Sequence, residues 1–226
     1  MKNRFLLTLT LLLIGFNNSL KAQEIIDKLA KDVCSCIQKQ EVKNSDIIRS
    51  CFEDILISNM KELKEHYEAN TIEDLDVENI GILIGSKLVK DCTFILENYN
   101  SETVGSDKEV AKQTDLSCND LKNGDFYYLT KRPDTSIIDT TFVTISNTMF
   151  LERMNRGRTY SMLDIKWKEN CEFELIFKES NDPFKKEFSK PGDVYEYEIL
   201  TNGVESFFLN LKWKGSTYQM ELFKLE

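Results

Sequence analysis

The sequence has little of what enzymes and nucleic-acid-binding proteins usually need. Histidine occurs once, as His66 among several glutamates, so no second residue pairs with it for acid–base or nucleophilic catalysis. The sequence lacks a Gly-x-Ser-x-Gly motif, a P-loop and a dinucleotide-binding fingerprint. Acidic residues outnumber basic ones by 38 to 29, which argues against binding to nucleic acid or an anionic membrane surface. We therefore expect a protein that is not an enzyme and needs no metal or cofactor.

Residues that break helices and strands are also scarce, with 9 glycines and 3 prolines in 226 residues. Aromatic residues are plentiful by contrast, and 14 Phe, 8 Tyr and 2 Trp favour a core rich in β-strands. A chain of this length that is 41% hydrophobic can form one or two packed cores. This composition excludes a disordered tail and a collagen.

Residues 1–22 have the pattern of a secretory signal peptide. Lys2 and Arg4 precede an apolar stretch over residues 5–16, and a short polar stretch ends at Ala22. About 12 apolar residues fall short of the ~20 that span a bilayer, which disfavours the alternative of an anchor helix. We predict cleavage after Ala22, which would leave a mature chain without a membrane span in the periplasm or outside the cell.

Residues 23–99 have the periodicity of amphipathic helices, because apolar side chains recur at i, i+3 and i+4 steps in three segments. The three stripes are Ile26, Leu29, Val33 and Ile37, then Ile48, Phe52, Ile55 and Leu63, then Ile80, Ile84, Leu88, Cys92, Ile95 and Tyr99. We expect a three-helix bundle in up-down-up order, with residues 41–44 as its first connection and a third helix over residues 79–99.

Residues 100–116 are polar and are expected to form a linker, and over residues 117–226 the apolar period changes to two. Eight such runs, separated by short turn sequences, predict eight antiparallel strands. The runs are 126–129, 142–145, 149–151, 160–167, 171–177, 194–200, 207–213 and 218–225. Short connections favour a meander that closes into a small barrel or forms a curved sheet. The predicted fold class is α+β, with a helical half stapled by disulfides followed by this β half.

One face of the predicted sheet is almost purely apolar and should form its interior. This face contains Phe126, Leu163, Ile165, Trp167, Phe173, Leu175, Phe177, Phe207, Leu209, Leu211 and Trp213. An eight-strand barrel either fills with side chains or holds one small ligand, and large aromatic side chains favour filling. We expect a solid core, and a ligand cavity is the alternative.

Six cysteines in an exported chain are expected to form three disulfides. A metal site made of Cys34, Cys36, Cys51 and Cys92 is the alternative, but Cys-x-Cys spacing without a nearby histidine does not match a zinc site. Cys34 and Cys36 project in nearly opposite directions from one helix, so each needs a different partner. We favour Cys36 with Cys51 and Cys34 with Cys92, and the swapped pairs remain open.

This assignment leaves Cys118 and Cys171 to bond in the β half. Residues 118–126 together with residues 165–175 resemble a family of small secreted Gram-negative bacterial proteins of unknown function. The resemblance covers the β half alone. It implies a short antiparallel β domain with cysteines at these two positions, which supports pairing Cys118 with Cys171.

A more distant similarity is to the lipocalin-like barrels, whose first strand carries Gly-x-Trp. The corresponding residues here are Gly124, Asp125 and Phe126, with Phe in place of Trp, and the second lipocalin signature is not evident. The similarity implies a small barrel with an interior that could carry a ligand.

Three functions are compatible with these features. The first, which we favour, is a non-enzymatic interaction protein that binds an unknown protein of the cell envelope. The second is a carrier of a small apolar ligand, which an internal cavity above ~300 Å³ would favour. The third is an envelope hydrolase that uses a carboxylate pair such as Glu172 with Glu174 or Glu196 with Glu198, although alternating acids on an outer sheet face explain these residues more simply.

Overall fold

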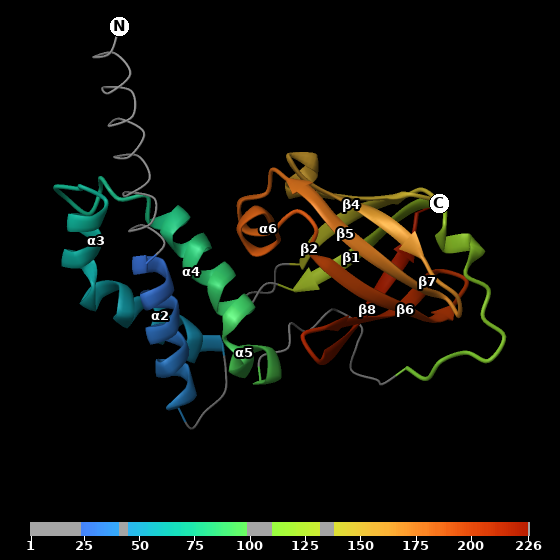
Figure 1. The fold of residues 1–226 in the computed structure, drawn as a ribbon, viewed down its shortest axis with the longest axis horizontal. Helices are drawn as coiled ribbons and strands as arrows, with labels where there is room; N and C mark the ends of the chain where they lie inside the picture. The colour runs from blue at the N-terminus through green and yellow to red at the C-terminus, as the bar shows by residue number, and fades with distance from the viewer. Residues whose placement is uncertain (1–23, 41–44, 99–109, 132–137, 226) are drawn as a thin grey trace, which may run out of the picture. The chain divides into compact units, whose positions relative to one another are not determined.

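The structure is a computed structural model that describes residues 24–40, 45–98, 110–131 and 138–225 (Figure 1). The predicted signal peptide, the connection at 41–44 and most of the predicted linker lie outside the described residues. The chain divides into two compact units, Met1–Asn98 and Tyr99–Glu226. Each unit is described by itself below.

The first unit is helical, but it does not have the three continuous helices that we predicted. It contains a helix over residues 24–38 and four labelled helices: α2 (Ser45–Ser58), α3 (Met60–His66), α4 (Val77–Asp91) and α5 (Thr93–Asn98) (Figure 1). The second and third predicted helices are each broken into two. Within the described residues, no helix has both the length and the apolar character needed to cross a membrane.

Two side-chain hydrogen bonds to the backbone lie at the break between α2 and α3. The Ser58 hydroxyl donates to the Asp54 carbonyl at 2.7 Å, and the Asn59 amide group donates to the Ile55 carbonyl at 2.8 Å. Such side-chain bonds compete with the regular hydrogen bonds of a helix. The break between α4 and α5 lies at Cys92, whose backbone leaves the helical region at φ −96° and ψ 88°.

The first and third predicted apolar stripes nevertheless supply much of the core of the helical unit, whereas Ile48, Phe52 and Ile55 of the second stripe are only half-buried. Buried residues of this unit that were predicted from periodicity are Ile26, Leu29, Val33, Ile37, Leu63, Ile80, Ile84, Leu88, Cys92 and Ile95. The helix over residues 24–38 therefore buries one continuous face, as its 3.6-residue period requires.

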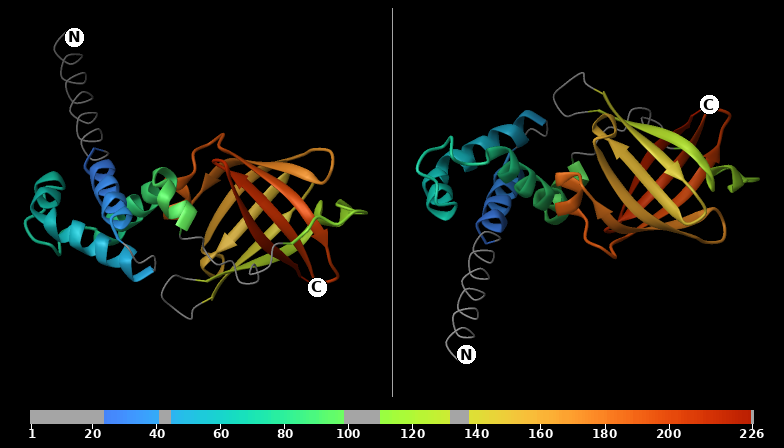
Figure 2. Two further views of the ribbon diagram at one scale, coloured as in Figure 1. Left: turned by 90° about the horizontal axis from the view of Figure 1, so that it is seen from below. Right: turned by 90° about the horizontal axis from the view of Figure 1, so that it is seen from above.

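The second unit contains a closed barrel of eight antiparallel strands in sequence order, which confirms the predicted meander (Figure 2). The strands are β1 (Gly124–Lys131), β2 (Ile138–Ile145), β3 (Met149–Met154), β4 (Thr159–Trp167), β5 (Glu172–Ser180), β6 (Val194–Asn202), β7 (Ser206–Trp213) and β8 (Ser216–Lys224). Pairing of β1 with β8 closes the barrel and leaves no free sheet edge. A short 3-10 helix, η1 (Asn119–Leu121), precedes β1 and adds Leu121 to the core.

Most of the predicted apolar face is buried inside the barrel. The eight buried members are Phe126, Leu163, Ile165, Phe173, Leu175, Phe177, Phe207 and Leu209. Trp167, Leu211 and Trp213 differ from the expectation, because each lies near the end of its strand and is only half-buried. Further core residues come from inward positions that we had not assigned, among them Val143, Ile145, Ile199 and Leu222.

Trp167 therefore packs at the edge of the core. Its ring lies 5.0 Å from that of Phe173, and its indole N–H donates to the Asn147 carbonyl at 3.1 Å. Because the ring is half-buried, we expect Trp167→Ala to lower the free energy of unfolding by about 1.5 to 3 kcal/mol, less than a buried aromatic would cost. Phe173→Ala, at a position 1% exposed, should cost about 3 to 5 kcal/mol. Urea unfolding of both variants checks this order, and a larger loss for Trp167→Ala would contradict it.

The structure has three disulfides, and their pairs match the preferred assignment. They join Cys34 to Cys92, Cys36 to Cys51 and Cys118 to Cys171, with Cα atoms 5.9, 5.8 and 5.6 Å apart. No cysteine is left free to ligate a metal. Three disulfides in one chain indicate an oxidising compartment outside the cytoplasm.

Candidate functional site

A short helix that the sequence analysis missed covers one end of the barrel. This helix, α6 (Pro183–Phe188), lies in the connection from the end of β5 to the start of β6 (Figures 1 and 2). The Asp182 carboxylate accepts a hydrogen bond from the Lys185 backbone N–H at 3.1 Å, and Pro183 occupies the first turn. Aspartate followed by proline is a typical helix start, so the sequence did contain a local signal for α6.

Beneath α6 lies a cavity of about 130 Å³, which we call the chamber. It is lined by inward-facing residues of β3 to β7 and by residues of α6 and its end. The lining residues are Phe150, Glu152, Ser161, Leu163, Leu175, Phe177, Lys185, Phe188, Ser189, Tyr195, Tyr197 and Leu211. The chamber thus combines an apolar wall with a polar side at the end of the barrel that carries α6.

Glu152 is the central polar group of the chamber. Its carboxylate accepts a hydrogen bond from the Tyr128 hydroxyl at 2.8 Å and forms an ion pair with the Lys185 ammonium at 3.1 Å. The Glu152 side chain is 10% exposed and the Lys185 side chain is 32% exposed. The carboxylate is therefore held inside the barrel, while the lysine extends from α6 to meet it.

Burial and the charge pair shift the proton affinities of the neighbouring groups. Burial raises the pKa of Tyr128 and of Tyr197, and the Glu152 carboxylate raises both further. Burial alone would lower the pKa of Lys185, but attraction to Glu152 and Tyr128 outweighs it and the pKa is raised. Both tyrosines stay neutral and Lys185 stays charged at neutral pH.

Contacts other than the ion pair also hold α6 over the chamber. The Phe188 ring lies 5.2 Å from the Trp213 ring at the end of β7 and 5.7 Å from the Phe184 ring. Just after the helix, the Ser189 and Tyr195 hydroxyls share a hydrogen bond of 2.6 Å. Half-buried Trp213 therefore helps to hold α6 at the end of the barrel.

The carboxylates of the hydrolase hypothesis lie elsewhere, on the outer face of β5 and β6. Glu172 faces Glu198 and Glu174 faces Glu196 across these two strands. Lysines neutralise them: Lys168 pairs with Glu174, and Lys112 lies 2.8 Å from Glu198. This arrangement is the charged outer face that alternation predicts.

Glu198 provides a test of this outer charge network. The hydrogen bond from Lys112, together with the charge of Lys212 at 3.4 Å, lowers the pKa of Glu198 below its ordinary value of 4.5. A lowered pKa stabilises the folded protein above pH 4.5, and this stabilisation is lost as pH falls through the folded pKa. We expect Glu198→Gln to lose less stability than the wild type between pH 5 and acid pH, measured by thermal melts. Glu169→Gln, at an exposed turn, serves as control, and an equal change in both variants would contradict the assignment.

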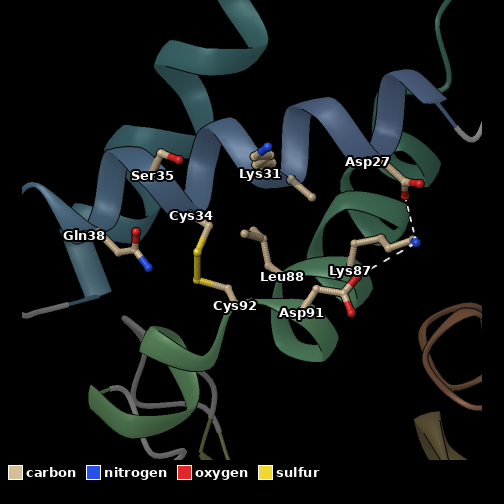
Figure 3. A pocket seen from close by; sticks show the side chains of 10 residues that line it. Asp27, Lys31, Cys34, Ser35, Gln38, Lys87, Leu88, Asp91 and Cys92 are labelled. Carbon is tan, nitrogen blue, oxygen red and sulfur yellow. Dashed lines mark ion pairs between the residues drawn. A yellow bond between two sulfur atoms is a disulfide. The ribbon is translucent and has the colours of Figure 1, made fainter.

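A second hollow lies in the helical unit, between the helix over residues 24–38 and α4 (Figure 3). It measures about 500 Å³, and the disulfide between Cys34 and Cys92 forms part of its wall. Lys87 lies 2.7 Å from Asp27 and 3.9 Å from Asp91. The two aspartates are 47% and 61% exposed, so water screens these charges and the ion pairs add little stability. The buried polar groups of the chamber make it the stronger candidate site.

The sequence analysis found Leu163, Leu175, Phe177 and Leu211 of the apolar wall but neither Phe150 and Phe188 nor the polar side of the chamber. Phe150 and Glu152 lie two positions apart in β3 and both face the interior, and Tyr195 and Tyr197 are related in the same way in β6. Period-two alternation alone could therefore have placed them inside, had strand β3 been extended beyond Leu151. Lys185 could not have been found in this way, because its role depends on α6 lying over the barrel.

The chain was also compared with family models, with curated proteins and with solved structures. None of the three comparisons found a match.

Proposed function

We propose that this chain is a non-enzymatic binding protein that acts outside the cytoplasm, and that its β unit binds a small molecule in the chamber. The three disulfides and the signal-like pattern of residues 1–22 support export to the periplasm or beyond. The ion pair between Glu152 and Lys185 at the end of an apolar core is the observation that carries the proposal.

A buried ion pair is weak evidence for stability, because desolvation of the two charges offsets their attraction. A barrel that served only as a scaffold would be about as stable with apolar side chains at these positions. The pair instead supplies fixed polar groups beside a cavity, which is the usual composition of a ligand site. This reasoning favours binding over a purely structural role for the chamber.

The size of the chamber also changes the ligand hypothesis from the sequence. At about 130 Å³ it lies below the ~300 Å³ expected of a carrier for drug-sized ligands. The rest of the interior is occupied by the buried core residues of the barrel. The proposed ligand is therefore small and partly polar, in place of a large apolar cargo.

The proposal is tested by filling the chamber. Leu211→Phe adds volume at a half-buried lining position, and Val194→Phe adds the same ring at an exposed site on β6 as a control. A screen of molecules with seven or fewer non-hydrogen atoms, read by NMR of the full mature chain, should give hits for the wild type and for Val194→Phe. These hits should be lost in folded Leu211→Phe. Hits that persist in that variant, or a wild type without hits, would overturn the proposal.

A further inference from the structure

The chamber offers hydrogen-bond donors that its own contacts do not use. The Lys185 ammonium has three N–H groups, and its bond to Glu152 uses one of them. Ser189 and Tyr195 have two hydroxyl protons between them, and their mutual hydrogen bond uses one. Both groups lie on the polar side of the chamber. A ligand that matches this side needs a hydrogen-bond acceptor.

The charges of the chamber favour an acceptor without charge of its own. Glu152 and Lys185 cancel each other at a separation of 3.1 Å. A carboxylate ligand would bring a third, uncompensated charge into a mostly apolar interior, which is costly. A neutral oxygen can accept from the lysine N–H without this penalty, and a hydrogen bond from a charged donor is stronger than one from a neutral donor.

The opposite wall fixes the body and the size of the ligand. Phe150, Leu163, Leu175 and Phe177 are buried apolar residues that line the chamber. An apolar cavity of about 150 Å³ takes up benzene, so a chamber of about 130 Å³ fits a body of similar or slightly smaller size. The partly exposed Lys185 side chain marks the side on which the chamber approaches solvent.

We propose that the ligand is a small neutral carbonyl compound, such as a short ketone, lactone or amide, with its oxygen bound by Lys185 and its apolar body against the buried wall. This inference rests on the proposed function and specifies the ligand class of the same site. Glu152 acts here as a positioning residue that holds the lysine and cancels its charge.

Three probes of equal size test the ligand class. Pentan-2-one, butanoate and 2-methylpent-1-ene each have six non-hydrogen atoms and differ at the oxygen-bearing end alone. NMR titrations of the full mature chain should give a dissociation constant for the ketone that is about tenfold or more below those of the alkene and the carboxylate. Equal affinities, or tightest binding of butanoate, would overturn the ligand class while leaving the chamber as a binding site. Failure of all three probes to bind would count against the proposed function as well.

A variant of Glu152 sharpens the test. Glu152→Gln leaves the Lys185 charge without a partner. The ligand preference of this variant should therefore reverse, and butanoate should bind more tightly than pentan-2-one. The double variant Glu152→Leu with Lys185→Met removes both charges and should lose most of the ketone preference, because the Ser189 and Tyr195 hydroxyl pair is then the donor that remains. An undiminished ketone preference in the folded double variant would overturn the role of Lys185. If Glu152→Gln does not fold, the wild-type comparison and the double variant still decide the question.

Discussion

Lys185→Met is expected to destabilise the β unit by about 3 to 5 kcal/mol, because Glu152 would remain inside the barrel without its ion-pair partner. The Glu152 side chain is 10% exposed, so water that enters in place of the lysine can compensate its charge only in part. Urea unfolding at pH 7 to 8, followed by tryptophan fluorescence, measures the change in the free energy of unfolding.

Two variants separate this effect from the general loss of a lysine. Lys190→Met removes a lysine from an exposed pair with Glu187 in the same connection and should change stability by less than about 0.5 kcal/mol. Glu152→Leu combined with Lys185→Met replaces the buried pair with apolar side chains and should recover most of the lost stability. A double variant as unstable as Lys185→Met alone would contradict the account of a buried pair.

Removal of the disulfide between Cys118 and Cys171 should lower the free energy of unfolding of the β unit by about as much as Lys185→Met does. The two cysteines are 53 residues apart, and closing a loop of this length restricts the unfolded chain by about 4 kcal/mol on the chain-entropy account. The bond also ties the segment before η1 to the residue before β5. We expect the double serine variant to show a much lower melting temperature of the β unit in calorimetry.

The disulfide between Cys36 and Cys51 provides the control. It spans 15 residues in the helical unit, and its removal should cost about 3 kcal/mol there. Because the two units have separate cores, this variant should leave the melting temperature of the β unit unchanged. A β transition that falls equally in both variants would contradict separate cores.

The barrel was predictable because successive side chains of a strand point to opposite faces of the sheet, and the apolar residues of this sequence follow that period of two. Alternation placed Leu163, Ile165 and Phe173 on one face, and short turns left a meander as the simplest topology. Closure was left open between a barrel and a curved sheet, because pairing of β1 with β8 joins residues about 100 positions apart.

The breaks in the helical unit were less predictable. The apolar stripe continues across Asn59 and across Cys92, so periodicity alone favours unbroken helices. The breaks coincide with side-chain hydrogen bonds of Ser58 and Asn59 and with a local change of backbone angles at Cys92. Hydrophobic periodicity contains neither kind of information.

The polar side of the chamber was missed for a different reason. A charged residue such as Glu152 is taken as the end of a strand when its ion-pair partner is not known. That partner, Lys185, is 33 residues away in the sequence. The pairing depends on the strand register and on α6 together. Functional positions are expected to break local rules in this way, because their partners come from distant parts of the chain.

The most direct measurement is to observe where a small ligand contacts the protein. Pentan-2-one, added to the protein with labelled leucine methyl groups, should show intermolecular NOEs to Leu163, Leu175 and Leu211, which line the chamber. Leu222, buried in the barrel but outside the chamber lining, should show none. NOEs to the three chamber leucines would establish binding beneath α6. A folded protein that shows NOEs only to other leucines, or none at ligand saturation, would contradict the account.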